Sequence, residues 1–158
     1  MFLITIVLLM SDALAGAQIF SSSAGDIEVD TVARGLEHPW SLAFLPNNRM
    51  LVTERPGRMR IVTRTGKLSP PLAGLPNLVV QGQASLMDVV IDHTYQRNGT
   101  IYFCFSGITN GDTEIVRAQL IDGDDPRLDA VEVIFHQDGS SDDTHASASR
   151  KLAMGSCS

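Results

Sequence analysis

The chain has 158 residues, of which 44% are hydrophobic and 19% are charged, and this is the composition of one ordinary globular domain. Its formal net charge is −6, and its 12 Lys and Arg residues are scattered along the chain, which leaves no basic stripe for a nucleic-acid backbone. These numbers exclude a wholly disordered chain and argue against nucleic acid as a partner.

The first segment is apolar. A run of apolar residues extends over 2–10 and is followed by Ala13-Leu14-Ala15, a pattern that signal peptidases cut. The run is shorter than the roughly 20 residues that span a bilayer. We therefore expect residues 1–15 to be a signal peptide, no membrane span after its cleavage, and a periplasmic or secreted mature protein. A buried N-terminal strand or helix is the alternative.

From Asp26 onward the sequence predicts short β-strands joined by tight turns, with almost no helical periodicity. The turns are rich in Pro, Gly and Asn. A linker at residues 68–76 contains too many prolines to be a central strand. The predicted strands are residues 41–45, 50–54, 59–63, 86–92, 100–106, 114–121 and 130–136.

The order of elements repeats along the chain. The stretch SLAFLPNNRMLVTE matches LMDVVIDHTYQRNGTIYFCF at a displacement of roughly 45–50 residues, a period typical of β-propeller blades. The predicted fold is therefore all-β, a partial β-propeller of about three blades. A β-sandwich of short strands is the competing architecture.

Three blocks carry a resemblance to a known family: EHPWSLAFLPNNRMLVTERPGRMRIV, LSPPLAGLP and QGQASLMDVVIDHTYQRNGTIYFCFS. In this order they resemble the first blades of the soluble, pyrroloquinoline-quinone (PQQ)-dependent aldose and glucose dehydrogenases. The resemblance implies a six-bladed propeller in which loops hold PQQ and the sugar above the central channel, and it implies export. We expect residues 26–145 to be the N-terminal blades and residues 146–158 an irregular, truncated tail.

The resemblance assigns a cofactor-binding role to Gln83. In the family, a glutamine of the block similar to GQASLMD reaches the cofactor from the loop before the innermost strand of a blade. An amide both donates and accepts hydrogen bonds, so it can hold a quinone or carboxylate oxygen without adding charge. The alternative is a glutamine that is merely solvated in a surface loop.

The resemblance also assigns a catalytic role to His145, in DDTHASASRKL. The family's histidine is the general base that takes the proton of the sugar C1 hydroxyl while hydride leaves C1 for the quinone. In the family a calcium ion polarises the quinone carbonyl, and the resemblance implies that its ligands lie in later blades. Four residues separate His145 from Arg150, where the family usually has three, so a solvated histidine in a polar tail is the alternative.

Other candidates are weaker. Trp40 is expected to be a packing anchor between blades, and His93 and His136 to be surface residues. The aspartates at 122–125 and 138–143 are expected to form turns, because neither group has the glycine and glutamate of an EF-hand loop.

The resemblance thus implies part of an exported quinoprotein that oxidises aldose sugars at C1 to lactones, with an external electron acceptor. The piece is expected to be inactive alone, since a second wall for the cofactor and the calcium ligands would come from later blades. A non-catalytic propeller that serves as a recognition module is the alternative, because fold does not determine function.

Overall fold

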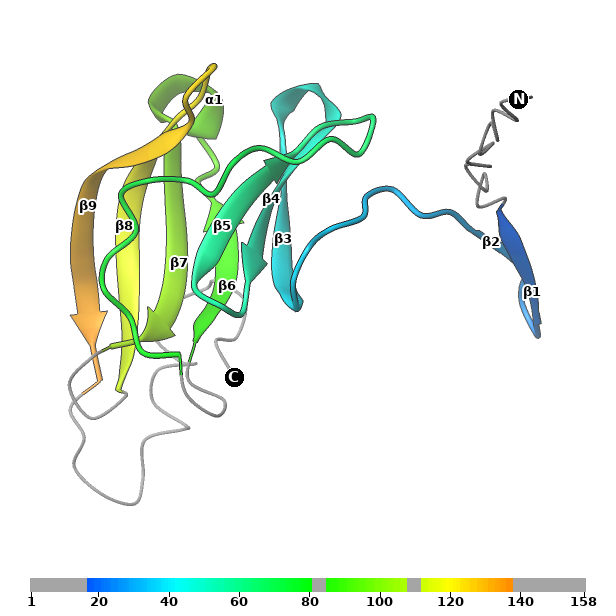
Figure 1. Ribbon diagram of the computed structural model, residues 1–158, viewed down its shortest axis with the longest axis horizontal. Helices are drawn as coiled ribbons and strands as arrows, with labels where there is room; N and C mark the ends of the chain where they lie inside the picture. Colours follow the sequence, from blue (N-terminus) through cyan, green and yellow to red (C-terminus); the bar gives the residue numbers. More distant parts are fainter. Residues whose placement is uncertain (1–16, 81–84, 108–111, 138–158) are drawn as a thin grey trace, which may run out of the picture. The chain divides into compact units, whose positions relative to one another are not determined.

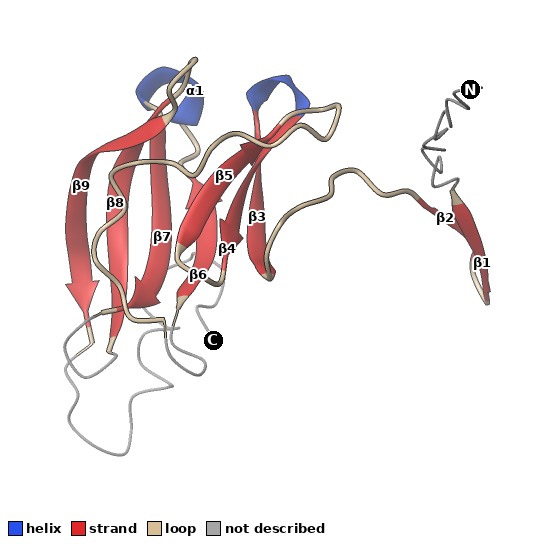
Figure 2. Cartoon of the chain, viewed as in Figure 1, coloured by secondary structure: helices blue, strands red, loops and turns tan. Residues whose placement is uncertain are grey.

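The computed structural model describes residues 17–80, 85–107 and 112–137. The described elements are strands, one 3₁₀ turn and one short α-helix (Figures 1 and 2). The chain divides into two units, Met1–Val32 and Ala33–Ser158. Among the described residues, no helix has the length and apolar character needed to cross a membrane.

The first unit contains a hairpin of β1 (Gln18–Ser22) and β2 (Gly25–Val29), joined by a turn at residues 23–24, and Gly25 has φ of +124°. Every residue of both strands is exposed. Phe20 pairs with Ile27, so apolar side chains meet on one face of the hairpin. Neither β1 nor β2 is among the predicted strands, because their apolar residues are too few to give a clear alternation.

The second unit begins with a three-stranded antiparallel sheet of β3 (Pro39–Leu45), β4 (Arg49–Glu54) and β5 (Arg58–Val62). A 3₁₀ turn, η1 (Pro46–Asn48), joins β3 to β4. Asn47 and Asn48 have φ of +61° and +55°, a region that asparagine tolerates better than most residues. The predicted strands at 41–45, 50–54 and 59–63 are confirmed to within a few residues.

A four-stranded antiparallel sheet follows, in the order β6 (Leu86–Ile91), β7 (Thr100–Ser106), β8 (Thr113–Ile121) and β9 (Arg127–His136). The sequence predicted a simple turn at 97–99 between the first two of these strands. The structure has instead one helical turn, α1 (Tyr95–Asn98), which ends at Gly99 in the left-handed region with φ of +61°. β9 also begins three residues before the predicted start at residue 130.

The two sheets share one core. Each contributes one apolar face, and the principal contacts between the sheets are those of β6 with β3 and β4. The core consists of Ala43, Leu45, Leu51, Met59, Ile61, Leu72, Leu86, Val89, Tyr95, Ile101, Phe103, Phe105, Val116, Ala118, Leu120 and Leu128. The first strands of both sheets therefore lie together on one side of the core.

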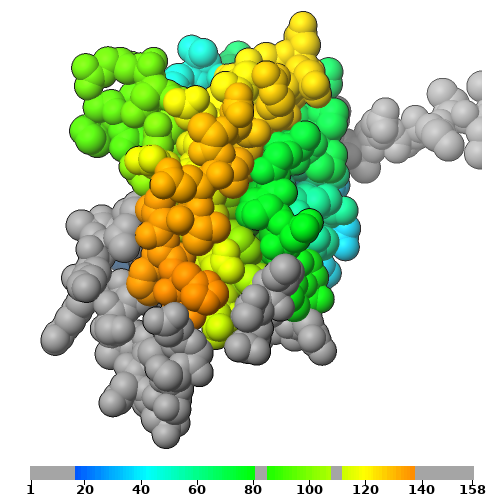
Figure 3. Space-filling view, turned by 90° about the vertical axis from the view of Figure 1, so that its left-hand side faces the viewer, coloured from blue at the N-terminus to red at the C-terminus, as the bar shows by residue number. Residues whose placement is uncertain are grey.

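The linker after β5 lies between β5 and β9, the last strands of the two sheets. Its Leu72 N–H donates to Met59 O in β5 over 2.8 Å, and Leu128 N–H in β9 donates to Ala73 O over 2.8 Å. Figure 3 shows the linker, in green, beside β9, in orange. A Cβ added at Gly74 would lie 2.3 Å from Leu128 O, so only glycine fits this approach. The linker lies between β5 and β9, whereas β3 and β4 contact β6 directly. The two sheets therefore move apart from their first strands to their last strands, as neighbouring propeller blades do.

Both sheets carry exposed apolar side chains. On β3 they are Trp40, Leu42 and Phe44, with relative exposures of 45%, 49% and 73%. On β9 they are Val131, Val133 and Ile134, and Val133 pairs with the core residue Val116, so it lies on the core-facing side of its sheet. The two-sheet unit therefore exposes apolar side chains on the outer face of β3 and along the edge strand β9.

Candidate active site

Both predicted site residues, Gln83 and His145, lie outside the described residues. Gln83 falls within 81–84, and His145 within 138–158. The candidate site is therefore built from the described residues that flank 81–84. In Figure 1 these lie at the lower end of the two sheets, where β3 and β6 begin and β4 and β7 end.

The chain on both sides of 81–84 is held by one residue, Ser106, the last of β7. Val79 N–H donates to Ser106 O over 3.1 Å, and Ser106 N–H donates to Ser85 O over 3.0 Å. Ser85 and Ser106 have relative exposures of only 1% and 6%. The described residues on both sides of 81–84 are thus held at a single fixed point at the end of β7.

The first strands of both sheets, β3 and β6, are irregular near this end. The pairing of β3 with β4 shifts register between Pro39 and Ser41, and the pairing of β6 with β7 shifts between Leu86 and Val89. Such bulges bend a strand and are common beside active sites. Neither bulge was predicted from the sequence.

The turn between β4 and β5 packs against the segment that leads to 81–84. Gly57 has φ of +86°, and a Cβ there would lie 2.9 Å from Leu78 Cδ1 and 3.5 Å from Val80 Cγ2. Leu78 itself packs against the core. The first sheet therefore packs against Leu78 and Val80, the residues that lead to 81–84.

A buried carboxylate, Glu54, organises that turn. It is the last residue of β4 and has no solvent exposure. Its oxygens accept hydrogen bonds from Glu37 N–H, from Arg60 Nε over 2.8 Å and from Arg58 Nε over 3.2 Å. Burial alone would raise the pKa of Glu54, but the Glu37 N–H and the two guanidinium groups outweigh it and hold this pKa below its ordinary value. Glu54 is therefore a structural anion at pH 7.

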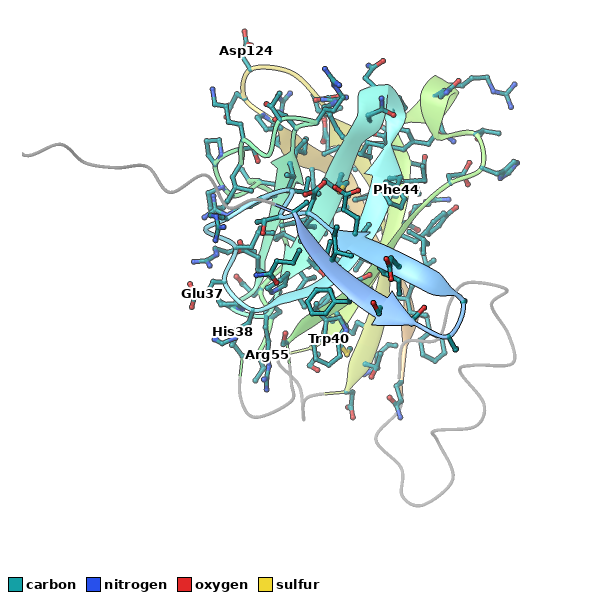
Figure 4. All side chains as sticks on the ribbon, turned by 90° about the vertical axis from the view of Figure 1, so that its right-hand side faces the viewer. Glu37, His38, Trp40, Phe44, Arg55 and Asp124 are labelled. Carbon is teal, nitrogen blue, oxygen red and sulfur yellow. The ribbon has the colours of Figure 1, made fainter. Side chains whose placement is uncertain are left out.

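Two further side chains stand at the same end. His38, just before β3, has φ of +48°, and its carbonyl accepts a hydrogen bond from Arg55 N–H over 3.0 Å. Figure 4 shows the side chains of His38 and Arg55 close together at the edge of the molecule. Left-handed φ is uncommon for residues other than glycine and is often found at functional sites. Trp40, expected as a packing anchor, lies half exposed on the flank of β3.

The remaining candidates lie elsewhere. The His93 side chain is 88% exposed, as expected for a surface residue, and that of His136 is 41% exposed with Nδ1 3.4 Å from Glu114 Oε1. Asp122 accepts a hydrogen bond from Arg49 over 2.8 Å, which joins the far ends of the two sheets. Within the described ranges, no group of three or more His, Cys, Asp or Glu side chains could hold a metal ion.

A hollow of about 340 Å³ lies on the outer face of the second sheet, away from the start of β6. Its lining is polar and includes Arg117 and Glu132, which form an ion pair of 2.6 Å. The hollow therefore does not coincide with the predicted site.

Sequence reasoning missed Glu54. It was predicted only as the end of a strand, although its register partner Arg58 and the alternate residue Arg60 are both cationic. Two arginines placed two apart on the strand that follows a glutamate would have indicated the cluster, because alternate residues of a strand share a face.

Residues 36–156 match the family model for glucose / sorbosone dehydrogenase. An aldose sugar dehydrogenase of Escherichia coli, YliI, is 37% identical over 83 residues, which are 52% of this chain and 22% of the relative. A crystal structure of a glucose dehydrogenase superposes with a TM-score of 0.65 at 39% identity, over 70% of this chain and 33% of that one. The PQQ-bound form of an aldose sugar dehydrogenase from Streptomyces coelicolor gives a TM-score of 0.63 at 25% identity, over 78% and 35%.

The chain thus spans from about a fifth to about a third of the length of these relatives. The likeness in fold extends across both sheets, and it confirms the prediction of an all-β chain that forms part of a β-propeller. The match to the family model covers most of the chain. The chain belongs to the glucose / sorbosone dehydrogenase family.

Proposed function

We propose that this chain supplies the first blades of an exported quinoprotein that oxidises aldose sugars at C1 to lactones and passes the electrons to an external acceptor. The family match over residues 36–156 carries the proposal. A PQQ-bound aldose sugar dehydrogenase among its structural relatives supports the choice of cofactor. Alone, the chain is expected to be inactive, because positioning by several blades would be lost.

Gln83 is the proposed cofactor contact. The hydrogen bonds of Val79 and Ser85 with Ser106 support this role, since they fix the described residues on both sides of 81–84. The polar groups at this end, including the side chains of His38 and Arg55, suit a cofactor that carries quinone oxygens and carboxylates. PQQ, when bound, would supply the two-electron acceptor for hydride from C1.

His145 is the proposed general base. Its neutral imidazole would accept the proton of the C1 hydroxyl as the C1–H bond breaks, so that the C1–O bond becomes the lactone carbonyl.

The described residues do not fit a calcium site. They contain no cluster of three or more potential metal-ligating side chains. We propose that any calcium ligands lie in other blades, and no step above depends on the ion.

The proposal that the protein is exported depends on the sequence of its first 15 residues. The apolar run in 2–10 and the small residues at 13–15 support cleavage near residue 15 and a periplasmic or secreted product. N-terminal sequencing of the mature protein, recovered from outside the cytoplasm, would test this. An unprocessed N-terminus in the cytoplasm would contradict it.

The function is tested in protein expressed from its complete gene, stripped of cofactor and then given PQQ and Ca²⁺. Sugar-dependent dye reduction should appear with aldoses, and Gln83→Ala should weaken PQQ binding about tenfold. His145→Ala should lower turnover by about 10²–10⁴ with little change in PQQ affinity.

His93→Ala is the control, because that histidine is 88% exposed at the opposite end of β6. It should leave both quantities unchanged. Failure of the wild-type protein to bind PQQ would favour the recognition module, and unchanged turnover in His145→Ala would remove that residue from the mechanism.

A further inference from the structure

Thr53 connects the two sheets through a single hydroxyl group. It lies in β4, has no solvent exposure, and its Oγ1 donates to Met87 O in β6 over 2.8 Å. The same oxygen accepts a hydrogen bond from Ser41 N–H in β3 over 3.1 Å. One buried hydroxyl therefore joins β3, β4 and β6.

The bulge in β6 explains why the Met87 carbonyl accepts a hydrogen bond from a side chain. Leu86 pairs with Phe105 and Val89 with Phe103, so Met87 and Asp88 together face a single residue of β7, Cys104. A bulge disrupts the hydrogen-bond ladder at such residues. The Thr53 hydroxyl satisfies the Met87 carbonyl, which would otherwise lose a hydrogen bond inside the protein.

The location of this bond is specific. Met87 is two residues after Ser85, whose carbonyl bonds to Ser106 at the end of β7. The start of β6 is thus fixed twice, by β7 through Ser106 and by the first sheet through Thr53. Valine would fill the same volume in an apolar core, so the hydroxyl rather than the shape of Thr53 makes the second attachment.

We propose that Thr53 is a positioning residue, whose hydroxyl holds the bulged start of β6 so that the cofactor-binding end of this strand keeps its geometry. The inference rests on the proposed function, because it assigns the cofactor to this end of the sheets. Thr53 itself is buried and does not touch the cofactor; it acts through the Met87 carbonyl.

Three variants test this role in protein expressed from its complete gene. Thr53→Val removes only the hydroxyl, and Thr53→Ser keeps it. Thr63→Val is the matched control: Thr63 Oγ1 accepts a turn hydrogen bond from Lys67 N–H over 3.0 Å at the other end of the same sheet. The measurements are PQQ dissociation constants, urea denaturation, and amide hydrogen exchange across residues 85–91.

Thr53→Val should raise the PQQ dissociation constant about tenfold and speed exchange at the start of β6. Thr53→Ser should restore both to about the wild-type level. Thr63→Val should lose stability with no change in PQQ affinity, which separates positioning from general destabilisation.

The role is overturned if Thr53→Val folds and binds PQQ as the wild type does, or if Thr53→Ser is as impaired as Thr53→Val. Unchanged exchange in Thr53→Val would overturn it even when PQQ affinity falls. A wild-type protein that takes up no PQQ would overturn the proposed function, and with it the cofactor role of Thr53; this result is seen without any variant.

Discussion

The sheet of β3–β5 and the sheet of β6–β9 begin with the same backbone pattern. Each has a bulge near the start of its first strand. In each, the residue just before that strand accepts a hydrogen bond at the end of the second strand: His38 from Arg55 over 3.0 Å, and Ser85 from Ser106 over 3.0 Å. The repeat therefore extends to individual backbone hydrogen bonds.

The side chains at these equivalent places differ. The first sheet surrounds its start with the buried Glu54 and its arginines, and the second uses two small buried serines. Backbone geometry is thus repeated between blades while side-chain chemistry is not. This is how a repeated fold can carry one site at one place, because function is determined by local chemistry and not by the fold.

The largest effect should come from the core that the two sheets share. Phe103→Ala in the second sheet should cost about 3–5 kcal/mol, and Met59→Ala in the first about 2–5 kcal/mol. Phe103 and Met59 are 2% and 0% exposed, and both belong to one cluster. Urea denaturation should show a single transition in each variant. Two separate transitions would show that the sheets fold independently, contrary to a common core.

The linker between the outer strands provides the next test. Gly74→Ala should destabilise the protein by roughly 2–3 kcal/mol, because φ is +89° and the new Cβ would meet Leu128 O at 2.3 Å.

Gly123→Ala is the control for backbone strain alone, since its φ is +146° and nothing lies within 4 Å of the added Cβ. It should cost about 1 kcal/mol in the same assay. Equal losses in the two variants would mean that the close approach of linker and β9 contributes nothing.

The buried carboxylate that distinguishes the first sheet should have a smaller effect. Glu54→Gln should cost about 2 kcal/mol at pH 7, since it leaves Arg58 and Arg60 with a neutral partner while part of each guanidinium stays solvated.

The pH dependence follows from the lowered pKa of Glu54, which the Glu37 N–H and both arginines hold down against the effect of burial. Its stabilisation is complete above the ordinary pKa of 4.5 and is lost as pH falls below it. The difference between wild type and Glu54→Gln in urea denaturation should therefore shrink from pH 7 to pH 3. A constant difference would show that the Glu54 charge is unimportant.

The sequence predicted the strands well, because apolar runs bounded by Pro, Gly and Asn are strong local signals. Residues 50–54 and 100–106 match β4 and β7 closely. The helical turn α1 was missed, since four residues are too few to show helical periodicity. β1 was missed because only two of its residues are large and apolar.

The site was less predictable. The roles of Gln83 and His145 came from a family resemblance and stay predictions. The bond from Thr53 to Met87 and the cluster around Glu54 depend on which strands become neighbours. Such contacts arise from tertiary packing and bulges, which a single sequence does not encode as local patterns.

The smallest effect concerns the opposite end, where the two first strands end differently. β3 turns through Asn47 and Asn48 in left-handed conformations, whereas the turn after β6 is held by Asp92. The Thr94 hydroxyl and then its N–H, at 2.7 Å from Asp92 Oδ1, lower the pKa of Asp92 from 3.8 to about 2. Thr94→Val removes the hydroxyl alone, so the pKa should rise part of the way back toward 3.8.

Carboxyl NMR shifts would measure this pKa, and Thr94→Ser should keep it near the wild-type value. Because the folded pKa is the lower one, the contribution of Asp92 to stability is complete above pH 3.8 and is lost as pH falls from 3.8 to about 2. This window lies below the pH at which the Glu54 network starts to weaken, so the two sheets should respond to acid in sequence. An Asp92 pKa that stays at about 2 in Thr94→Val would assign the effect to the backbone N–H, and the two turns would then differ in geometry and not in side-chain chemistry.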